Sequence, residues 1–369
     1  MIIGIDASNL KSGGSITHLK YVLRNVKFTH EKISKIVIWG GEVPVSYIKD
    51  DPLIEVVKLK FWDRNSLTRF VWKNILLAFR ARNSCDILYV PGGIYLGTFR
   101  PFISMFRNIL PFHEIKFNLS DGRYFRYKIL KILLLITFRN SSGIIFISEA
   151  SRKFLNRKFP FLRSKSQKIV HHGVDHEFWK KREESVSGEV VNIIYVSTID
   201  YHKNHIHVID ALQSLIHAGY KIRLHLVGNS FDKCYRKYLP VEANIDPESV
   251  FIKRYDFISQ DKINELYDCS DFFLYASSAE TFGQVLLEAM AKKLSIICSD
   301  IPTNRELVGD HAFYFDEKSA ESISNAVRKA LNEEKKRKSF IDKAYKRSLH
   351  YSWRKCAEET FSFIVRHNE

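Results

Sequence analysis

Short apolar runs alternate with longer amphipathic segments along this chain, and the whole alternation occurs twice. In the first half, with helical stretches between them, the expected strands are residues 2–5, 35–39, 54–57, 87–90 and 143–147. In the second half the expected strands are residues 191–196, 223–227, 272–275 and 295–298, and the expected helices are 206–218, 262–269 and 281–293. This alternation is typical of parallel sheets whose strands are joined by helices.

The length fits two such sheets. A chain of 369 residues is about twice the size of an ordinary domain. The polar stretch 180–188, which ends in Gly, separates the two rounds of the pattern. We therefore expect an α/β protein with two Rossmann-like domains, 1–180 and 188–349, facing each other across a cleft, with a final helix (350–369) that packs back on the first domain. Ligands of such sheets bind at the carboxyl ends of the strands, so function is sought in the loops after the strands.

Several classes of protein are disfavoured by composition. No stretch reaches the roughly 18 apolar residues of a membrane-spanning helix, and the start, MIIGIDASNL, has the pattern of a strand rather than a signal peptide. We therefore expect a cytoplasmic protein. The five cysteines are scattered without a CxxC pair, which predicts neither a disulfide framework nor a metal site.

The net charge of +16 is concentrated in the first half of the chain. Residues 1–185 hold 32 Lys and Arg against 15 Asp and Glu, whereas residues 186–369 hold 25 against 26. A basic half indicates a polyanionic partner, either nucleic acid or anionic lipid. No RNA- or DNA-binding module is recognisable, so nucleic acid is not expected.

Two segments of the basic half favour lipid. Helices over 61–82 and 124–138 would place basic side chains beside aromatic and aliphatic ones, a pattern typical of a peripheral membrane surface. The residues expected to face the membrane are Arg69, Trp72, Lys73, Arg80, Arg126 and Lys128. The alternative is two ordinary core-facing helices with solvated charges. On the first interpretation the protein lies on the inner face of the cytoplasmic membrane.

The segment 277–290, SSAETFGQVLLEAM, is the most informative for chemistry. Its Thr-x-x-Gln spacing, Thr281 to Gln284, predicts a capping box that starts a helix at Phe282 and Gly283. Free amides at such a helix start attract a phosphate, and a glycine lets it approach closely. Carboxylates beside a phosphate are better used to accept hydrogen bonds from hydroxyl groups. An anion site flanked by Glu280 and Glu288 therefore predicts a nucleotide-sugar site.

The same segment resembles a known family. A Glu, seven residues and a second Glu, with Phe-Gly after the first and Glu-Ala-Met around the second, resembles the signature of retaining GT-B glycosyltransferases of the family-4 type (glycosyl transferases group 1). The segment 196–205, VSTIDYHKNH, resembles the family's phosphate loop. HHGVD, LHLVGNS, residues 251–256 and DIPTNRELVG extend the resemblance over most of the chain.

The resemblance implies roles for individual residues of the second domain. Lys203 would bind the donor diphosphate, Glu280 would orient the donor sugar and Glu288 would bind the ribose. The remaining donor-binding residues expected there are Gly228, Tyr255, Thr281, Phe282 and Gly283. The family usually has an Arg five residues before the lysine, where this chain has Thr198, which can replace only part of that charge. His202 and His205 are candidates for compensating it.

In the first domain the resemblance implies a glycine-rich donor loop and a histidine facing the sugar. KSGGS supplies Gly13 and Gly14, although a Gly-Gly pair also occurs in simple turns. His113 is the candidate histidine, with Arg107 and Asn108 as alternatives in the same loop; a surface pair with Glu114 is the other interpretation.

The function implied is transfer of a sugar, with retention, from a UDP- or GDP-sugar to a glycan acceptor, without a metal or other cofactor. An acceptor on a lipid diphosphate would account for the basic, aromatic-rich half, as in bacterial surface polysaccharide synthesis (O-antigen, lipopolysaccharide or capsule). Two alternatives remain: a GT-B nucleotide-sugar 2-epimerase, and a polyanion-binding protein without enzymatic activity.

Overall fold

The computed structural model describes residues 1–10, 14–26, 32–41, 51–59, 66–113, 123–175, 189–229, 251–256 and 258–368. These residues form two compact units. Unit 1 comprises Met1–Gly173 and Tyr351–Glu369, and unit 2 comprises Val174–His350. The stretch 180–188, expected to hold the domain boundary, lies outside the described residues.

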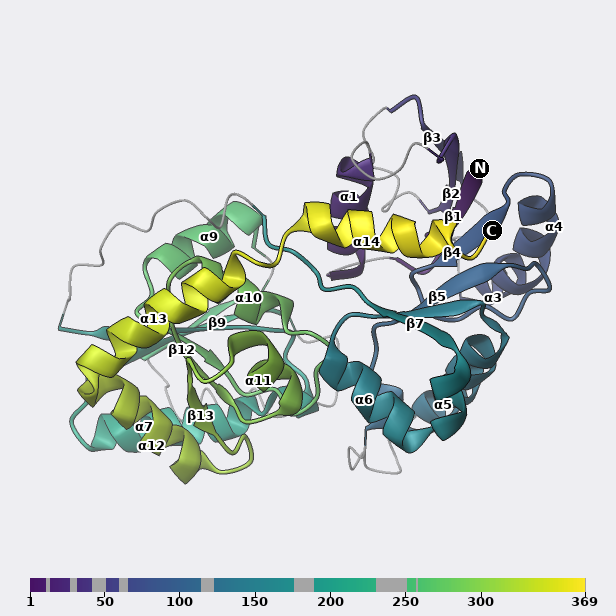
Figure 1. The fold of residues 1–369 in the computed structure, drawn as a ribbon. Coiled ribbons are helices and arrows are strands. Elements are labelled where there is room, and N and C mark those ends of the chain that lie inside the picture. The colour runs from purple at the N-terminus through teal and green to yellow at the C-terminus, as the bar shows by residue number, and fades with distance from the viewer. Residues whose placement is uncertain are drawn as a thin grey trace. The chain divides into compact units, whose positions relative to one another are not determined.

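Unit 1 contains a seven-stranded parallel sheet with the order β3-β2-β1-β4-β5-β6-β7 (Figure 1). Its central strands are buried on both faces, which is why apolar residues dominate them in the sequence. The strands are β1 (Ile2–Asp6), β2 (Lys35–Gly40), β3 (Ile54–Lys58), β4 (Ile87–Val90), β5 (Phe102–Phe106), β6 (Gly143–Phe146) and β7 (Ser166–Ile169).

The helices of unit 1 lie between these strands along the chain, and the last helix of the chain also belongs to unit 1. They are α1 (Gly14–Arg24), α3 (Ser66–Val71), the π-helical turn η2 (Trp72–Leu76), α4 (Leu77–Arg82), the 3-10 turn η3 (Leu110–Phe112), α5 (Arg123–Asn140), α6 (Glu149–Lys158), the 3-10 turn η4 (Pro160–Ser164) and α14 (Trp353–Val365).

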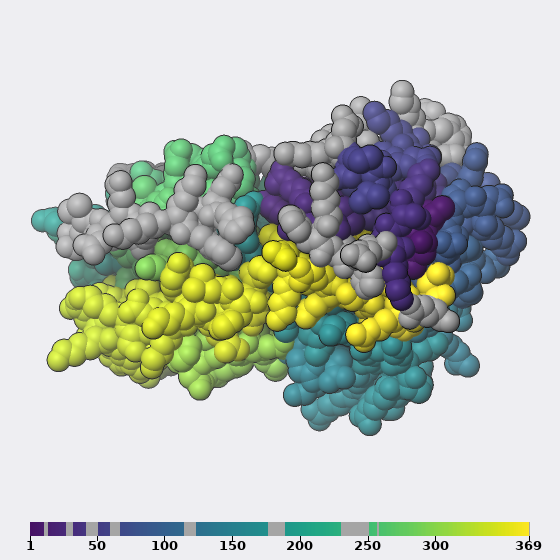
Figure 2. Space-filling view, turned by 45° about the horizontal axis from the view of Figure 1, so that its top comes forward, coloured from purple at the N-terminus to yellow at the C-terminus, as the bar shows by residue number. Residues whose placement is uncertain are grey.

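Helix α14 packs on α1, and Figure 2 shows the yellow C-terminal residues lying against the purple N-terminal ones. Tyr21 of α1 stacks on Trp353 of α14 at a centroid distance of 5.1 Å. Gly173, the last residue of unit 1 before the chain crosses over, lies so close to the start of α14 that an added Cβ would be 2.1 Å from the Trp353 amide nitrogen. Only glycine fits at this crossing.

Unit 2 contains a six-stranded parallel sheet with the order β10-β9-β8-β11-β12-β13. Its strands are β8 (Val191–Val196), β9 (Ile222–Val227), β10 (Ile252–Tyr255), β11 (Phe272–Tyr275), β12 (Ser295–Ser299) and β13 (Phe313–Phe315). Its helices are the 3-10 turn η6 (Tyr201–Lys203), α7 (His205–His217), α9 (Gln260–Asp268), α10 (Gln284–Ala291), α11 (Pro302–Val308), α12 (Ala320–Asn332) and α13 (Glu334–Ser348).

All nine strands expected from the sequence are present within one residue of their expected bounds. The fold class is therefore confirmed: two parallel-sheet, Rossmann-like units. In each sheet the strand order reverses direction at a pair of central strands, β1 and β4 in unit 1 and β8 and β11 in unit 2. At such a switch point the loops diverge and leave a crevice at the carboxyl edge.

Candidate functional site

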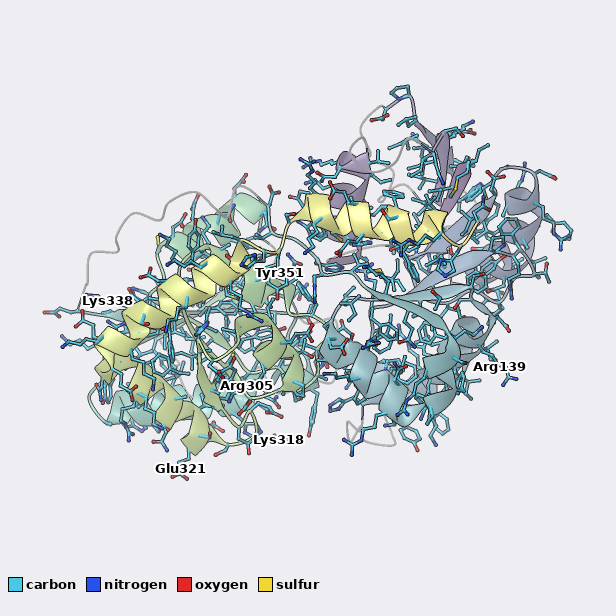
Figure 3. The ribbon with its side chains drawn as sticks, viewed as in Figure 1. Arg139, Arg305, Lys318, Glu321, Lys338 and Tyr351 are labelled. Carbon is cyan, nitrogen blue, oxygen red and sulfur yellow. The ribbon has the colours of Figure 1, made fainter. Side chains whose placement is uncertain are left out.

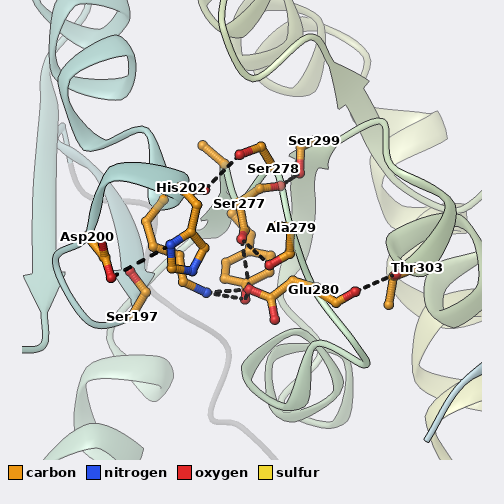
Figure 4. Close-up of polar contacts among 12 residues, drawn as sticks. Ser197, Asp200, His202, Ser277, Ser278, Ala279, Glu280, Ser299 and Thr303 are labelled. Atoms are coloured by element: carbon orange, nitrogen blue, oxygen red, sulfur yellow. Dashed lines mark hydrogen bonds and ion pairs between the residues drawn. The ribbon is translucent and has the colours of Figure 1, made fainter. Parts of the chain in front are cut away.

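The loops that follow β8 and β11 are tied together at the carboxyl edge of the unit 2 sheet. The Ser278 amide donates to the His202 carbonyl at 2.8 Å, and the Asn204 side chain donates to the Ala276 carbonyl at 2.7 Å. Asn204 has φ 53°, a left-handed conformation that Asn tolerates. It ends η6 and lets α7 begin at once. These contacts bring Lys203 next to Glu280. Figure 4 shows Glu280 with its contacts to Ser277 and Thr303.

One carboxylate oxygen is the centre of this cluster. Glu280 Oε1 accepts hydrogen bonds from Lys203 Nζ, from the Tyr275 hydroxyl at 2.6 Å and from Ser277 Oγ at 2.7 Å. Lys203 Nζ also donates to the Tyr275 hydroxyl at 3.1 Å. The Glu280 backbone carbonyl accepts from Thr303 Oγ1 at 3.0 Å, which anchors the loop to α11. The carboxylate is therefore held in one position before any ligand arrives.

The charges of this cluster keep Glu280 ionised. Burial alone would raise the pKa of Glu280, but the charges of Lys203 and His202, together with the hydrogen bonds from Lys203 and Tyr275, outweigh it and lower that pKa below 4.5. The second oxygen of the carboxylate accepts no hydrogen bond within the described residues. A fixed, ionised acceptor of this kind can orient a hydroxyl group of a ligand.

Helix α10 begins at Gln284, slightly after the start at Phe282 and Gly283 that the sequence predicts. Its N-cap residue is Gly283, with φ 91°, and no side chain caps it. The Gly283 amide donates to no group in the described part of the chain, and it lies three residues from Glu280. An unsatisfied amide at the positive end of a helix attracts an anion.

Glu288 lies one turn into α10 and is half-buried. Burial raises its pKa to about 7, and the charge of Asp175 adds to this effect, while hydrogen bonds from Gln284 and Tyr267 oppose it. The Tyr267 hydroxyl lies 3.4 Å from Glu288 Oε2. A carboxyl group that titrates near neutrality is common at functional sites. The role of Glu288 in binding ribose stays a prediction.

Gly228 and Tyr255 lie on the other side of β8. Gly228 has φ 139°, and a Cβ at this position would be 1.9 Å from the Ser197 carbonyl oxygen, so a side chain cannot be accommodated. Its amide donates to the Tyr255 carbonyl at 2.8 Å. The Tyr255 ring stacks on His225 at 5.9 Å. The loop after β9 is thereby packed closely against the loop after β8.

His205 does not compensate for the positive charge that is missing at Thr198. This side chain is buried, stacks on Tyr195 at 4.7 Å and has its Nε2 3.1 Å from Ser197 Oγ. Burial, with the charges of Lys203, His202 and Arg254, lowers the pKa of His205 to about 3, so it is neutral at pH 7. Thr198 is exposed. His202 Nδ1 is 3.8 Å from Asp200 Oδ2.

The site residues expected in unit 1 have varied positions. Gly14 is the exposed first residue of α1, directly after the end of the β1 loop, and Gly13 lies outside the described residues. His113 follows η3 and stacks on Phe154 of α6 at 6.4 Å. Arg107 is half-buried, and this burial lowers its pKa; Asn108 accepts from the Leu110 amide at 3.1 Å. The roles proposed for these residues stay predictions.

Two of the residues expected to face a membrane do not do so. Trp72 is 5% exposed and belongs to the core that α4 forms with β2 and β4. Lys73 is 3% exposed, and its Nζ lies 3.3 Å from Oδ2 of the buried Asp6. The membrane-facing prediction requires a regular α-helix, but a π-helical turn over Trp72–Leu76 changes the direction of the side chains. The buried carboxylate then provides a partner for the lysine.

The other four basic residues are accessible. Arg69 is half-buried, and Arg80, Arg126 and Lys128 are exposed. Large apolar side chains are exposed on the same helices. On α3, η2 and α4 they are Leu67, Phe70, Ile75 and Phe79, and on α5 they are Phe125, Ile129, Ile132 and Ile136. Figure 3 shows Arg139 at the exposed end of α5.

The sequence interpretation missed the side chains that hold Glu280. Tyr275 is the last residue of β11, Ser277 lies in the loop that follows, and Thr303 is on a helix far along the chain. A tyrosine that ends a buried strand is a usable signal, because that position aims at the carboxyl edge. The contact from Thr303 depends on the tertiary fold.

Among the residues described, no three His, Cys, Asp or Glu side chains form a metal-binding group, and no described helix is long and apolar enough to span a bilayer.

Residues 177–347 match the family model described as Glycosyl transferases group 1. The mannosyltransferase WbdA of Escherichia coli is 30% identical over 165 residues, which is 44% of this chain and 19% of WbdA. The chain thus covers about a fifth of the length of that relative. The capsular polysaccharide biosynthesis glycosyltransferase CapM of Staphylococcus aureus is 23% identical over 324 residues, which is 81% of this chain and 80% of CapM.

Solved structures with the same fold cover nearly the whole chain. The Anabaena protein HepE, crystallised with UDP and glucose, aligns with a TM-score of 0.73 at 17% identity over 99% of both chains. WaaG, a glycosyltransferase of lipopolysaccharide biosynthesis, aligns with a TM-score of 0.72 at 14% identity over 99% of this chain and 100% of WaaG. Residues 177–347, which contain the Lys203–Glu280 cluster, thus match the Glycosyl transferases group 1 model, and the chain as a whole has the GT-B fold of these structures.

Proposed function

We propose that this protein is a retaining glycosyltransferase that moves a sugar from a UDP- or GDP-sugar to a glycan acceptor, and that unit 2 binds the donor. The observation that carries the proposal is the Lys203–Glu280 cluster, a fixed cation and a fixed carboxylate three residues from an unsatisfied helix-start amide. The match of this segment to the Glycosyl transferases group 1 model supports it.

The chemistry follows from where charge develops. The bond between the anomeric carbon and the phosphate breaks through an oxocarbenium-like state, and negative charge collects on the departing diphosphate. Lys203 Nζ and the Gly283 amide would stabilise that charge. Removing Lys203 from Glu280 Oε1 would cost a buried ion pair, so we propose that Lys203 contacts the diphosphate while it keeps its bond to Glu280. These groups supply the stabilisation without a metal ion.

Glu280 orients the donor sugar in this proposal. Three donors occupy one of its oxygens, and the other oxygen is left to accept from sugar hydroxyls. Glu288, whose pKa is about 7, would bind the ribose hydroxyls as a carboxylate. The acceptor attacks from the side of the leaving group, which retains the configuration at the anomeric carbon.

We further propose that the acceptor is lipid-linked and that unit 1 contacts an anionic membrane, as in synthesis of a bacterial surface polysaccharide. The exposed apolar side chains of α3–α4 and α5, interspersed with Arg69, Arg80, Arg126 and Lys128, suit such a surface. Binding to vesicles that contain phosphatidylglycerol should fall at least tenfold in Leu67→Ser/Phe79→Ser, because about 1.5–3 kcal/mol is lost for each buried side chain. Leu349→Ser, at an exposed position of unit 2, is the matched control.

A thermal-shift screen against UDP- and GDP-sugars tests the donor site. A ligand at 100 times its Kd stabilises a protein by about 2.7 kcal/mol, which raises the unfolding midpoint of a unit of this size by roughly 5–10 °C. Release of nucleotide only when an acceptor is added supports transfer. Conversion of the sugar without an acceptor would instead identify an epimerase, and no shift with any nucleotide sugar would refute the proposal.

A further inference from the structure

A basic groove on unit 1 is lined by residues of helix α6, the turn η4 and the edge strand β7. Its volume is about 660 Å³, within the range of small-ligand sites. Five of its lining side chains are cations: Arg152, Lys153, Arg157, Arg163 and Lys165. Nothing in the proposed sugar-transfer site uses them.

Most of this charge is not neutralised by the protein. Glu149 accepts a bidentate pair of hydrogen bonds from Arg152, at 2.8 and 2.7 Å. These bonds lower the pKa of Glu149, so one carboxylate offsets one cation. Arg157 and Arg163 are exposed and form neither a hydrogen bond nor an ion pair within the described ranges of the chain. The groove therefore carries two guanidinium groups that are free to bind an anion.

Two amide side chains in the groove are already fixed. Asn156 Nδ2 donates to Gln167 Oε1 at 2.9 Å, and Gln167 Nε2 donates back to Asn156 Oδ1 at 3.0 Å. Gln167 Nε2 also donates to the Leu162 carbonyl at 2.6 Å. This pairing uses one hydrogen of Asn156 Nδ2 and one lone pair of each amide oxygen. The second hydrogen and the remaining lone pairs can bind hydroxyl groups without a rearrangement cost.

The chemistry of the lining selects among anionic ligands. Guanidinium groups bind carboxylates and phosphates in a bidentate manner, and fixed amides bind hydroxyls. None of the described residues that line the groove is aromatic or aliphatic, so they offer neither a stacking surface for the bases of single-stranded nucleic acid nor a surface for a lipid tail. A ligand with both acidic groups and hydroxyls fits best.

We propose that this groove binds an acidic oligosaccharide, one that carries carboxylate or phosphate groups on its sugars. The inference rests on the proposed function, because it assigns the groove to the non-reacting part of the glycan acceptor. Arg157 and Arg163 pair with the acidic groups, and the Asn156–Gln167 pair binds the hydroxyls between them. The acceptor is thereby selected by charge as well as by its reacting sugar.

The test compares two hexasaccharides on the full chain by isothermal titration calorimetry: hexagalacturonate, which has a carboxylate on every sugar, and maltohexaose, which has none. We expect hexagalacturonate to bind at least tenfold more tightly than maltohexaose. Arg157→Ala/Arg163→Ala should weaken hexagalacturonate binding at least tenfold and leave maltohexaose binding unchanged. Lys318→Ala/Arg328→Ala removes the same charge from exposed positions of unit 2 and is the matched control.

Three results would overturn the inference: equal binding of hexagalacturonate by the parent and the groove variant, equal weakening by the control variant, or equal affinity for the neutral hexasaccharide. A larger loss of affinity for a single-stranded oligonucleotide or for phosphatidylglycerol vesicles in the groove variant would assign the cations to those partners instead. The thermal shift with nucleotide sugars reports unit 2 alone. A thermal shift with a nucleotide sugar, together with a failed hexagalacturonate result, refutes only the assignment of the groove. The absence of any such thermal shift refutes the proposed function.

Discussion

Replacing Glu288 by Gln should stabilise the protein at pH 8 and have a much smaller effect at pH 4. Burial raises the pKa of this carboxyl from its usual 4.5 to about 7 in the folded state. A group whose pKa is raised by folding contributes stability that is present below pH 4.5 and is lost as the pH rises to about 7. Each pKa unit corresponds to about 1.36 kcal/mol, so the loss amounts to about 3 kcal/mol. Glutamine stays neutral and avoids this loss.

The assay is the free energy of unfolding in urea for the parent and for Glu288→Gln at pH values from 4 to 8. The variant's advantage over the parent should grow by about 3 kcal/mol across this range. Glu321→Gln, the same exchange at an exposed position of α12, controls for the chemical change itself. A difference that changes by less than about 1 kcal/mol would refute the claim that burial controls this carboxyl.

Three further predictions follow from the same region. Lys203→Ala should lower the free energy of unfolding by about 3–5 kcal/mol, because it leaves the Glu280 carboxylate uncompensated; equal denaturation curves would contradict the ion pair. Gly228→Ala should destabilise the protein by at least about 2 kcal/mol because its Cβ would collide with the Ser197 carbonyl, which thermal melting would detect. Nucleotide-sugar affinity should rise with pH up to about 7 and then level off, because Glu288 binds hydroxyls as a carboxylate; affinity that falls over this range in calorimetry would exclude that role.

The strands that could be predicted are those with a strong local signal. β4, β6, β8 and β11 are largely buried, so apolar residues dominate each of them in the sequence. β7 cannot be found in this way, because SQKI at the edge of the sheet is only partly buried and shows no apolar pattern. β13 is only three residues long, which is too short for any periodicity.

Errors arose where a distant residue decides the local structure. The prediction that Lys73 faces a membrane requires a regular helix. Neither the π-helical turn nor the buried Asp6 partner can be inferred from residue spacing. The Thr281–Gln284 spacing predicts a helix start at Phe282 and Gly283, but Gly283 adopts a left-handed conformation and α10 begins at Gln284. Glu280 and Lys203 were identified as site residues from their motifs. The hydroxyls of Tyr275 and Ser277 that fix the carboxylate became visible only in the fold.

The most direct test of the account is a crystal structure of the protein with the nucleotide sugar that gives the largest thermal shift. We predict that the diphosphate contacts Lys203 Nζ and the Gly283 amide, with the sugar hydroxyls on the open oxygen of Glu280 and the ribose at Glu288. A nucleotide bound away from the carboxyl edge of the unit 2 sheet, or a diphosphate that touches neither Lys203 nor the start of α10, would contradict it.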